Sequence, residues 1–182
     1  MLMVISPLMV EHRLIERMIK IIGAELDIAK STGLMDPVKI DSFVEFMRMY
    51  ADKIHHGKEE AILCKEIEKK NISIVHKAKV VEIVGEHIYG RSLVDRVVDA
   101  ANKYKAGQNE RLADIIFTFS EIAIFYTRHI DKEDKHLFVE LMRYFDFTEH
   151  DRMVKASQAY DAKYDLERYN RMVSFYEKEI KK

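Results

Sequence analysis

Apolar residues recur every three or four positions along most of the chain, which is the pattern of helices that each bury one face. Ser6-Pro7 and Asp36-Pro37 are typical helix starts, and glycine or asparagine follows several of the apolar runs. The four long helices are predicted over residues 6–32, 37–70 and 76–104 and from residue 109 onward. Since the links between them are short, the sequence predicts an all-α, up-down-up-down four-helix bundle.

A more polar segment follows the fourth long helix. Residues 148–151 resemble a capping box that opens a fifth helix, and a sixth is predicted from Asp165 onward. We therefore expect a four-helix bundle over residues 1–146 and a short C-terminal helical extension over residues 147–182 that packs on it. The extension is also a candidate surface for a homodimer.

The composition limits the expected partners of the protein. Charged residues make up 34% of the 182 residues, but the formal net charge is −1, so neither nucleic acid nor an anionic membrane is an expected partner. The single cysteine excludes an internal disulfide and fits a reducing compartment. No apolar run approaches the roughly 18 residues of a membrane span. We expect a soluble, cytoplasmic protein.

Two histidine–glutamate pairs carry the candidate chemistry. His55 and Glu59 are four residues apart, and so are His129 and Glu133. This spacing puts the two side chains of each pair on one face of a helix, one turn apart. An imidazole and a carboxylate held in this way can bind one metal ion together.

The overlapping pair His56 and Glu60 has the same spacing but a different predicted direction. At roughly 100° per residue, these two side chains point nearly opposite the apolar stripe, so we expect them to face solvent. His12 and His87 lie instead on the apolar stripes of the first and third helices. Together with His55 and His129, they are the inward histidines.

The four inward histidines are predicted to lie at one level of the bundle. Counted from the turn between neighbouring helices, their distances agree within three residues, or about 4.5 Å of helix. A single His–Glu pair is usually an exposed pair worth roughly a few tenths of a kcal/mol. A layer of buried imidazoles and carboxylates is different, because a buried carboxylate without a partner is costly and requires a cation.

The number of candidate ligands indicates which metal fits. Four imidazoles and two carboxylates exceed what one tetrahedral zinc ion takes. They suit two octahedral ions of the iron or manganese kind, which the carboxylates can bridge. The ferritin-like class of di-iron bundle is disfavoured, because it needs Glu-x-x-His on two helices and only Glu133 to His136 fits.

Four segments in order resemble the hemerythrin-like (HHE cation-binding) domain family: residues 9–13, 54–60, 85–91 and 129–134, the last followed by Leu137-Phe138. The resemblance covers about residues 6–146 and implies a non-haem centre with two iron ions, for which manganese or zinc could substitute. It implies terminal ligands and bridging carboxylates at His12, His55, His87, His129, Glu59 and Glu133.

Arg91 is one departure from the pattern of the oxygen-carrying members. These are similar but have a second histidine at this position of the third helix, so a fifth histidine is missing unless another residue supplies it. The departure argues against reversible oxygen carriage. Arg91, Tyr126 and His136 are candidates for a layer just outside the ligands. Arg91 could hold a carboxylate or form an outer ion pair, Tyr126 could donate a hydrogen bond, and His136 could be a spare ligand.

The ligand set and the resemblance lead to three hypotheses. The first is a non-enzymatic di-iron protein that binds or senses dioxygen, nitric oxide or iron, with a small diatomic molecule as its partner. The second is a di-iron enzyme that reduces peroxide or nitric oxide, or repairs iron–sulfur centres, at the same site. The third is a helical interaction module with a structural metal. We expect the first, because the sequence contains no separate catalytic constellation.

Overall fold

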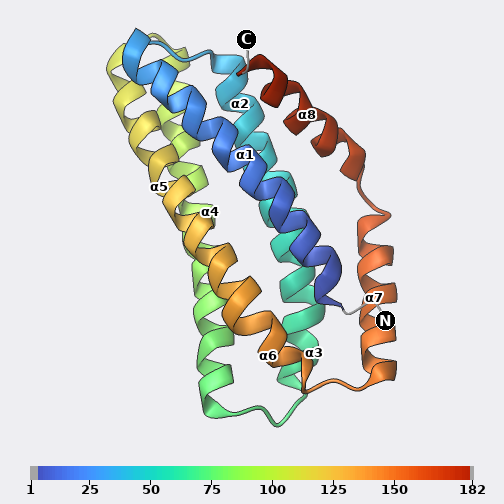
Figure 1. Cartoon of the computed structure of the whole chain (residues 1–182). Coiled ribbons are helices and arrows are strands. Elements are labelled where there is room, and N and C mark those ends of the chain that lie inside the picture. The colour runs from blue at the N-terminus through green and yellow to red at the C-terminus, as the bar shows by residue number, and fades with distance from the viewer. Residues whose placement is uncertain (1–3, 181–182) are drawn as a thin grey trace.

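The computed structural model describes residues 4–180 of the chain (Figure 1). These residues are almost entirely helical and include no strand, which confirms the predicted all-α class. The α-helices are α1 (Ile5–Thr32), α2 (Pro37–Glu45), α3 (Lys65–Glu68), α4 (Ile74–Lys105), α5 (Leu112–Lys132), α6 (Phe138–Met142), α7 (Phe147–Asp161) and α8 (Leu166–Glu179). Between them lie the π-helical segments η1 (Phe46–His56), η2 (Glu59–Cys64) and η4 (Glu133–Leu137) and the 3-10 turn η3 (Asn109–Arg111).

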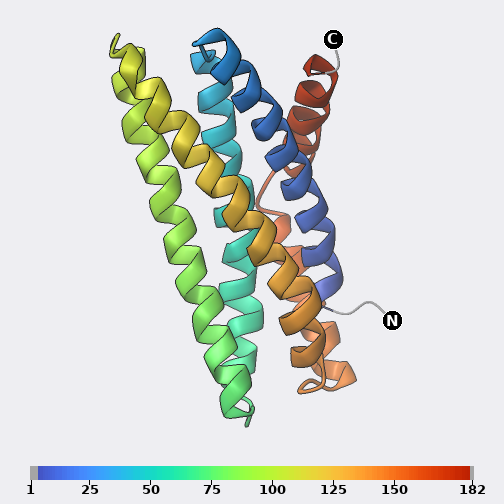
Figure 2. The same ribbon diagram turned by 60° about the vertical axis from the view of Figure 1, so that its left-hand side comes forward.

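Four long helical columns form the bundle (Figures 1 and 2). The first column is α1, the second runs from α2 to α3, the third is α4, and the fourth runs from α5 to α6. Successive columns run in opposite directions, and the first and third columns both pack against the fourth. Each column therefore presents one face to a shared interior.

The helix starts and ends follow mostly from local chemistry. The Asp36 side chain accepts a hydrogen bond from the backbone N–H of Val38, with Pro37 in the first turn, as predicted for the second column. Gly33 ends α1 with a positive φ of 70°, a conformation that glycine adopts without strain. Helix α1 begins at Ile5, one residue before the predicted Ser6.

The second column departs from a regular α-helix over η1 and η2. The apolar stripe predicts one continuous α-helix there, but i→i+5 hydrogen bonds replace i→i+4 bonds in these segments. A π-helix turns the chain through a smaller angle per residue, so two consecutive residues can share one face. Segment η4 makes the same change in the fourth column.

Helices α7 and α8 follow one another along one side of the bundle (Figure 1). Helix α7 packs against η2, and α8 packs against α1 and η1. The capping box at the start of α7 consists of Asp146 and Glu149, rather than Thr148 and Asp151 as predicted. The box lies two residues earlier because Asp146, with φ of −84° and ψ of 176°, already has the extended conformation of an N-cap residue.

The hydrophobic core consists of two clusters, one toward each end of the bundle. On α1, one cluster ends at Leu8 and the other begins at Leu14. On the fourth column, the corresponding limits are Leu137 and Ile130. Buried polar residues fill the level between the clusters, so that apolar packing holds this level from both sides. In the described part of the chain, no helix is long and apolar enough to span a membrane.

Two glycines allow a test of how closely α7 is fitted to the bundle. Gly23 and Gly57 are both partly exposed helical residues, but a Cβ at Gly23 would meet nothing within 4 Å, whereas one at Gly57 would lie 2.4 Å from the Tyr160 hydroxyl. Gly23→Ala should stabilise the protein by about 0.5–1 kcal/mol. Gly57→Ala should lose this gain, because Tyr160 must move and give up its hydrogen bond to the Lys53 carbonyl. Chemical denaturation of both variants measures the difference, and equal stabilisation would contradict the close fit.

Candidate metal centre

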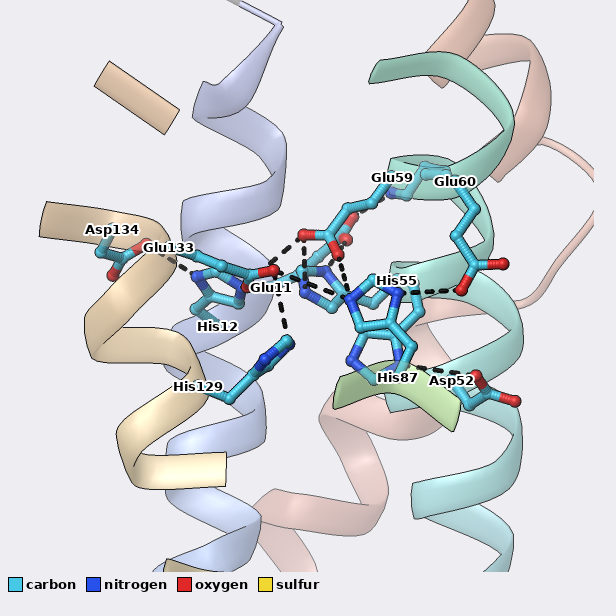
Figure 3. A network of polar contacts seen from close by, with 12 residues as sticks. Glu11, His12, Asp52, His55, Glu59, Glu60, His87, His129, Glu133 and Asp134 are labelled. Carbon is cyan, nitrogen blue, oxygen red and sulfur yellow. Dashed lines mark hydrogen bonds and ion pairs between the residues drawn. The ribbon is translucent and has the colours of Figure 1, made fainter. Parts of the chain in front are cut away.

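Five histidines and two glutamates meet between the four columns, at the level that separates the two apolar clusters (Figure 3). We call this set the histidine–glutamate layer. Its members are His12 from α1, His55 and His56 from η1, Glu59 from η2, His87 from α4, His129 from α5 and Glu133 from η4. All are buried, each at most 1% exposed. The six residues proposed from the sequence thus lie together, with His56 in addition.

The donor atoms of this layer form two groups, and within each group they lie within 4.8 Å of one another. The first group contains His56, Glu59, His87 and His129, and the second contains His12, His55, Glu59 and Glu133. Each group has the donor types of a transition-metal site. Because Glu59 belongs to both groups, the two sites would be neighbours.

The inward-facing atoms of the layer have no hydrogen-bond partner in the described part of the chain. This holds for Nε2 of all five histidines and for both carboxylate oxygens of Glu59 and Glu133. Buried polar atoms are nearly always paired, and an unpaired one costs about 1–3 kcal/mol, more if it is charged. Cations between these atoms would satisfy them together, so the residues fit a metal centre.

Glu59 has one oxygen near each donor group. Its Oε1 lies 3.3 Å from Nε2 of His55, and its Oε2 lies 3.2 Å from Nε2 of His87. Figure 3 shows this carboxylate extending from its helix toward Glu133. A carboxylate placed in this way can contribute one oxygen to each of two ions.

Glu133 has the same arrangement from the opposite side of the layer. Its Oε2 lies 3.1 Å from Nε2 of His12, and its Oε1 lies 3.3 Å from Nε2 of His129. Burial favours the neutral form of this carboxyl, but His129, followed by His12 and His87, outweighs burial and holds the pKa of Glu133 well below its usual range. Glu133 is therefore ionised and can bind a cation near pH 7.

The outward nitrogen of every histidine in the layer faces a carboxylate. The Nδ1 atoms lie 2.7–3.4 Å from carboxylate oxygens in the pairs His12–Asp134, His55–Glu11, His56–Asp52, His87–Glu60 and His129–Glu86. Histidine ligands usually donate their other N–H to such an acceptor, which fixes the tautomer and the ring orientation. The Nε2 atoms are then left free to face a metal.

Four of the five acceptors stand next to a layer residue in the sequence but bond a histidine on another column. Glu11, for example, directly precedes His12, yet it bonds His55. The same holds for Glu60, Glu86 and Asp134. Residue spacing does not predict these roles, because the histidine that each acid bonds depends on how the neighbouring columns pack.

A cation pairs with each acceptor carboxylate. The pairs are Arg13–Asp134, Lys58–Glu11, Lys132–Glu86, Arg91–Asp52 and Arg91–Glu60. Each ion pair favours the charged form of its carboxylate, which opposes the effect of burial that raises the pKa of Glu11 and Asp52. Charged acceptors make the stronger hydrogen bonds to the imidazoles. The layer is therefore surrounded by alternating charges.

His56 is the main correction to the prediction from the sequence. An α-helical second column would place His56 in solvent, but the structure buries it with 1% of its surface exposed. The smaller turn per residue in η1 directs both His55 and His56 inward, with ring centroids 5.5 Å apart. His56 also stacks on His87 at 3.9 Å. The histidine missing at position 91 therefore has a counterpart from the second column.

Three residues were predicted to lie just outside the ligands, and the structure places them differently. Arg91 pairs with two acceptor carboxylates, so it is both an outer ion pair and a residue that holds carboxylates in place. Tyr126 is buried and stacks on His56 with ring centroids 5.9 Å apart. His136 is exposed instead, because the π-helical turn of η4 directs it away from the bundle, and the structure does not support it as a spare ligand.

Carboxylates raise the pKa of two histidines in the layer. Burial by itself lowers the pKa of His12, but Asp134 and Glu133 outweigh burial and raise it to about 10. His87 is also buried, and the neighbouring glutamates raise its pKa to about 11. Without metal, both imidazoles carry a proton near pH 7 and partly balance the buried carboxylates.

Burial dominates at the two histidines of η1. It lowers the pKa of His55 to about 3 and holds the pKa of His56 well below its ordinary value. Both imidazoles are therefore neutral near pH 7, which is the form that binds a metal.

The fold and the layer agree with the comparison with known families. Residues 3–141 match the hemerythrin HHE cation binding domain, a range that ends before α7 and α8. No curated protein and no solved structure matches the chain. The match covers well over half of the chain, and it includes every residue of the buried histidine–glutamate layer. The chain therefore belongs to the hemerythrin HHE cation-binding domain family.

Proposed function

We propose that this chain is a non-haem di-iron protein that binds or senses dioxygen or nitric oxide at a carboxylate-bridged centre. The observation that carries the proposal is the pair of donor groups that share Glu59, with buried and unpaired atoms facing inward. Five imidazoles and two carboxylates are too many for one tetrahedral zinc ion. They suit two octahedral ions of the iron or manganese kind.

The protein would hold the two ions unequally. One ion would have His56, His87 and His129, the other would have His12 and His55, and Glu59 and Glu133 would bridge them. Bound iron supplies open coordination positions and can change its oxidation state. The ion held by two imidazoles would have fewer protein donors and could accept a small external ligand.

A small, mostly apolar cavity lies beside the two glutamates, and its lining would favour an uncharged molecule over an ion. Its volume of about 10 Å³ is close to the room that a single water-sized molecule needs. Apart from the glutamates, it is lined by Leu63, Cys64, Val80, Ile83, Leu137, Phe138 and Leu141. Burial and nearby glutamates raise the pKa of Cys64 to about 12, so its thiol stays protonated and adds no charge to the wall.

His56 also removes the objection to dioxygen that Arg91 raised. The layer contains five histidines even though Arg91 occupies the position where oxygen carriers of similar sequence have one. Dioxygen therefore remains a candidate ligand beside nitric oxide.

Iron analysis and rapid mixing test the proposal directly. Protein prepared anaerobically with iron supplied should hold one iron ion for each of the two donor groups. Reduced protein mixed with dioxygen or nitric oxide in a stopped-flow spectrometer should give one stoichiometric absorption change. Iron content far below this value would contradict the proposal. Repeated turnover with a reductant would favour the alternative, a di-iron enzyme that reduces peroxide or nitric oxide.

His56→Ala should weaken iron binding by more than about tenfold, because it removes an inward imidazole that nothing replaces. His136→Ala is the matched control, since it removes an exposed imidazole from outside the layer. Titration of iron into the metal-free variants measures both affinities. If His56→Ala bound iron as tightly as the control, His56 would not be a ligand.

Iron uptake near pH 7 should release about two protons per chain, because His12 and His87 must lose theirs before binding. The pKa values of these imidazoles in the metal-free protein are about 10 and about 11, so both are protonated throughout the neutral range. Affinity should therefore rise with pH across this range. A pH indicator in weakly buffered solution measures the release, and uptake without proton release would contradict the assignment of these two ligands.

A further inference from the structure

Lys58 is more deeply buried than the other cations around the layer. Its side chain is 1% exposed, whereas those of the other cations that pair with acceptor carboxylates are 32–54% exposed. A buried ammonium is costly unless it is paired. Lys58 has carboxylates on two sides, because it contacts Glu11 and its Nζ lies 2.6 Å from Oδ1 of Asp161.

These contacts form a continuous path from a C-terminal helix to the layer. Asp161 is the last residue of α7 and pairs with Lys58, which in turn pairs with Glu11. The other oxygen of Glu11 lies 3.0 Å from Nδ1 of His55. Charges alternate along this path, and Lys58 and Glu11 are shielded from solvent. Water therefore only weakly screens the effect that a change of charge at Asp161 has on His55.

Helix α7 is fixed next to this path by a second contact. The Tyr160 hydroxyl donates a hydrogen bond of 2.8 Å to the Lys53 carbonyl in η1. The same hydroxyl occupies the space that a side chain at position 57 would need. Tyr160 thus contacts the segment that carries His55, and the neighbouring Asp161 contacts Lys58 just beyond the end of that segment.

The residue that begins this path lies outside the part of the chain that matches the family. The match ends at residue 141, and Asp161 follows it by a full helix. Asp161 of α7 therefore shares the Lys58 ammonium with Glu11. Glu11 is in turn the hydrogen-bond acceptor of His55, a candidate metal ligand.

We propose that Asp161 is a positioning residue for the metal centre, which acts through Lys58 and Glu11 on His55. The proposal rests on the di-iron function proposed above. Through these contacts, metal binding or oxidation at the centre would affect α7. Because such coupling is reciprocal, a change in α7 would also affect the metal centre.

The direction of the effect follows from competition for Lys58. Asp161 and Glu11 share the ammonium, so loss of the Asp161 charge leaves Lys58 more strongly bound to Glu11. Glu11 then becomes a weaker acceptor for the Nδ1 proton of His55, and the imidazole becomes a less basic ligand. A less basic ligand stabilises oxidised iron less, so the reduction potential of the centre should rise.

Asp161→Asn tests this without a change of shape. The full-length protein is loaded anaerobically with iron, its metal content is measured, and its midpoint potential is determined by spectroscopic titration. The potential of Asp161→Asn should be more positive than that of the wild type at equal iron content. Arg152→Met is the matched control, because it breaks another ion pair of α7, to Glu66, that does not lead to the layer.

A double-variant cycle tests whether the effect passes through Glu11. Glu11→Gln should itself raise the potential, and Asp161→Asn should add little in that background. Hydrogen exchange gives a second measurement: iron loading should slow exchange of the α7 amides in the wild type and in Arg152→Met, and this difference should be lost in Asp161→Asn.

The outcomes separate this proposal from the one on which it rests. A wild-type chain that holds no iron would overturn both. Full iron content with equal potentials in Asp161→Asn, Arg152→Met and the wild type would overturn only the role of Asp161. An equal shift by Asp161→Asn with and without Glu11→Gln would show a direct charge effect and overturn the path through Glu11.

Discussion

The cost of burying polar atoms without partners is the constraint on which the rest of this structure depends. Five imidazoles and two carboxylates lie at one level, out of contact with water. Their outward atoms are satisfied by a ring of carboxylates, and each of those carboxylates is satisfied by a lysine or an arginine. The inward atoms have no hydrogen-bond partner in the described part of the chain, and cations between them would satisfy all of them together. The need for metal thus follows from the same rule that governs any protein interior.

The helices are arranged to keep this level in place. Apolar clusters on both sides fix the heights of the four columns, so that residues distant in sequence arrive together. The acceptor carboxylates then tie neighbouring columns to one another, because most of them bond a histidine from a different column. Packing sets the position of each helix, and the hydrogen bonds set the direction of each ring.

Much of this arrangement could be predicted from residue spacing. The apolar period gave the long helices, the distances from the turns placed His12, His55, His87 and His129 at one level, and the structure brings these residues together with Glu59 and Glu133. The inward direction of the His56 side chain could not be predicted, because the prediction assumes the angle per residue of an α-helix, whereas η1 is π-helical. The acceptors could not be assigned either, since the helix that an acid faces depends on how the neighbouring columns are rotated.

The π-helical segment η1 has a consequence for comparisons between relatives of this chain. A π-helical turn holds one residue more than an α-helical turn, so the sequence beyond it is displaced by one position against a relative whose helix is regular. His55 and His56 would then compete for a single aligned position, and one of them would be read as an insertion. The regular angle of an α-helix predicts four inward histidines from this sequence, whereas the folded chain buries five in the layer. Subgroups defined by ligand number therefore need the register of the backbone as well as the alignment.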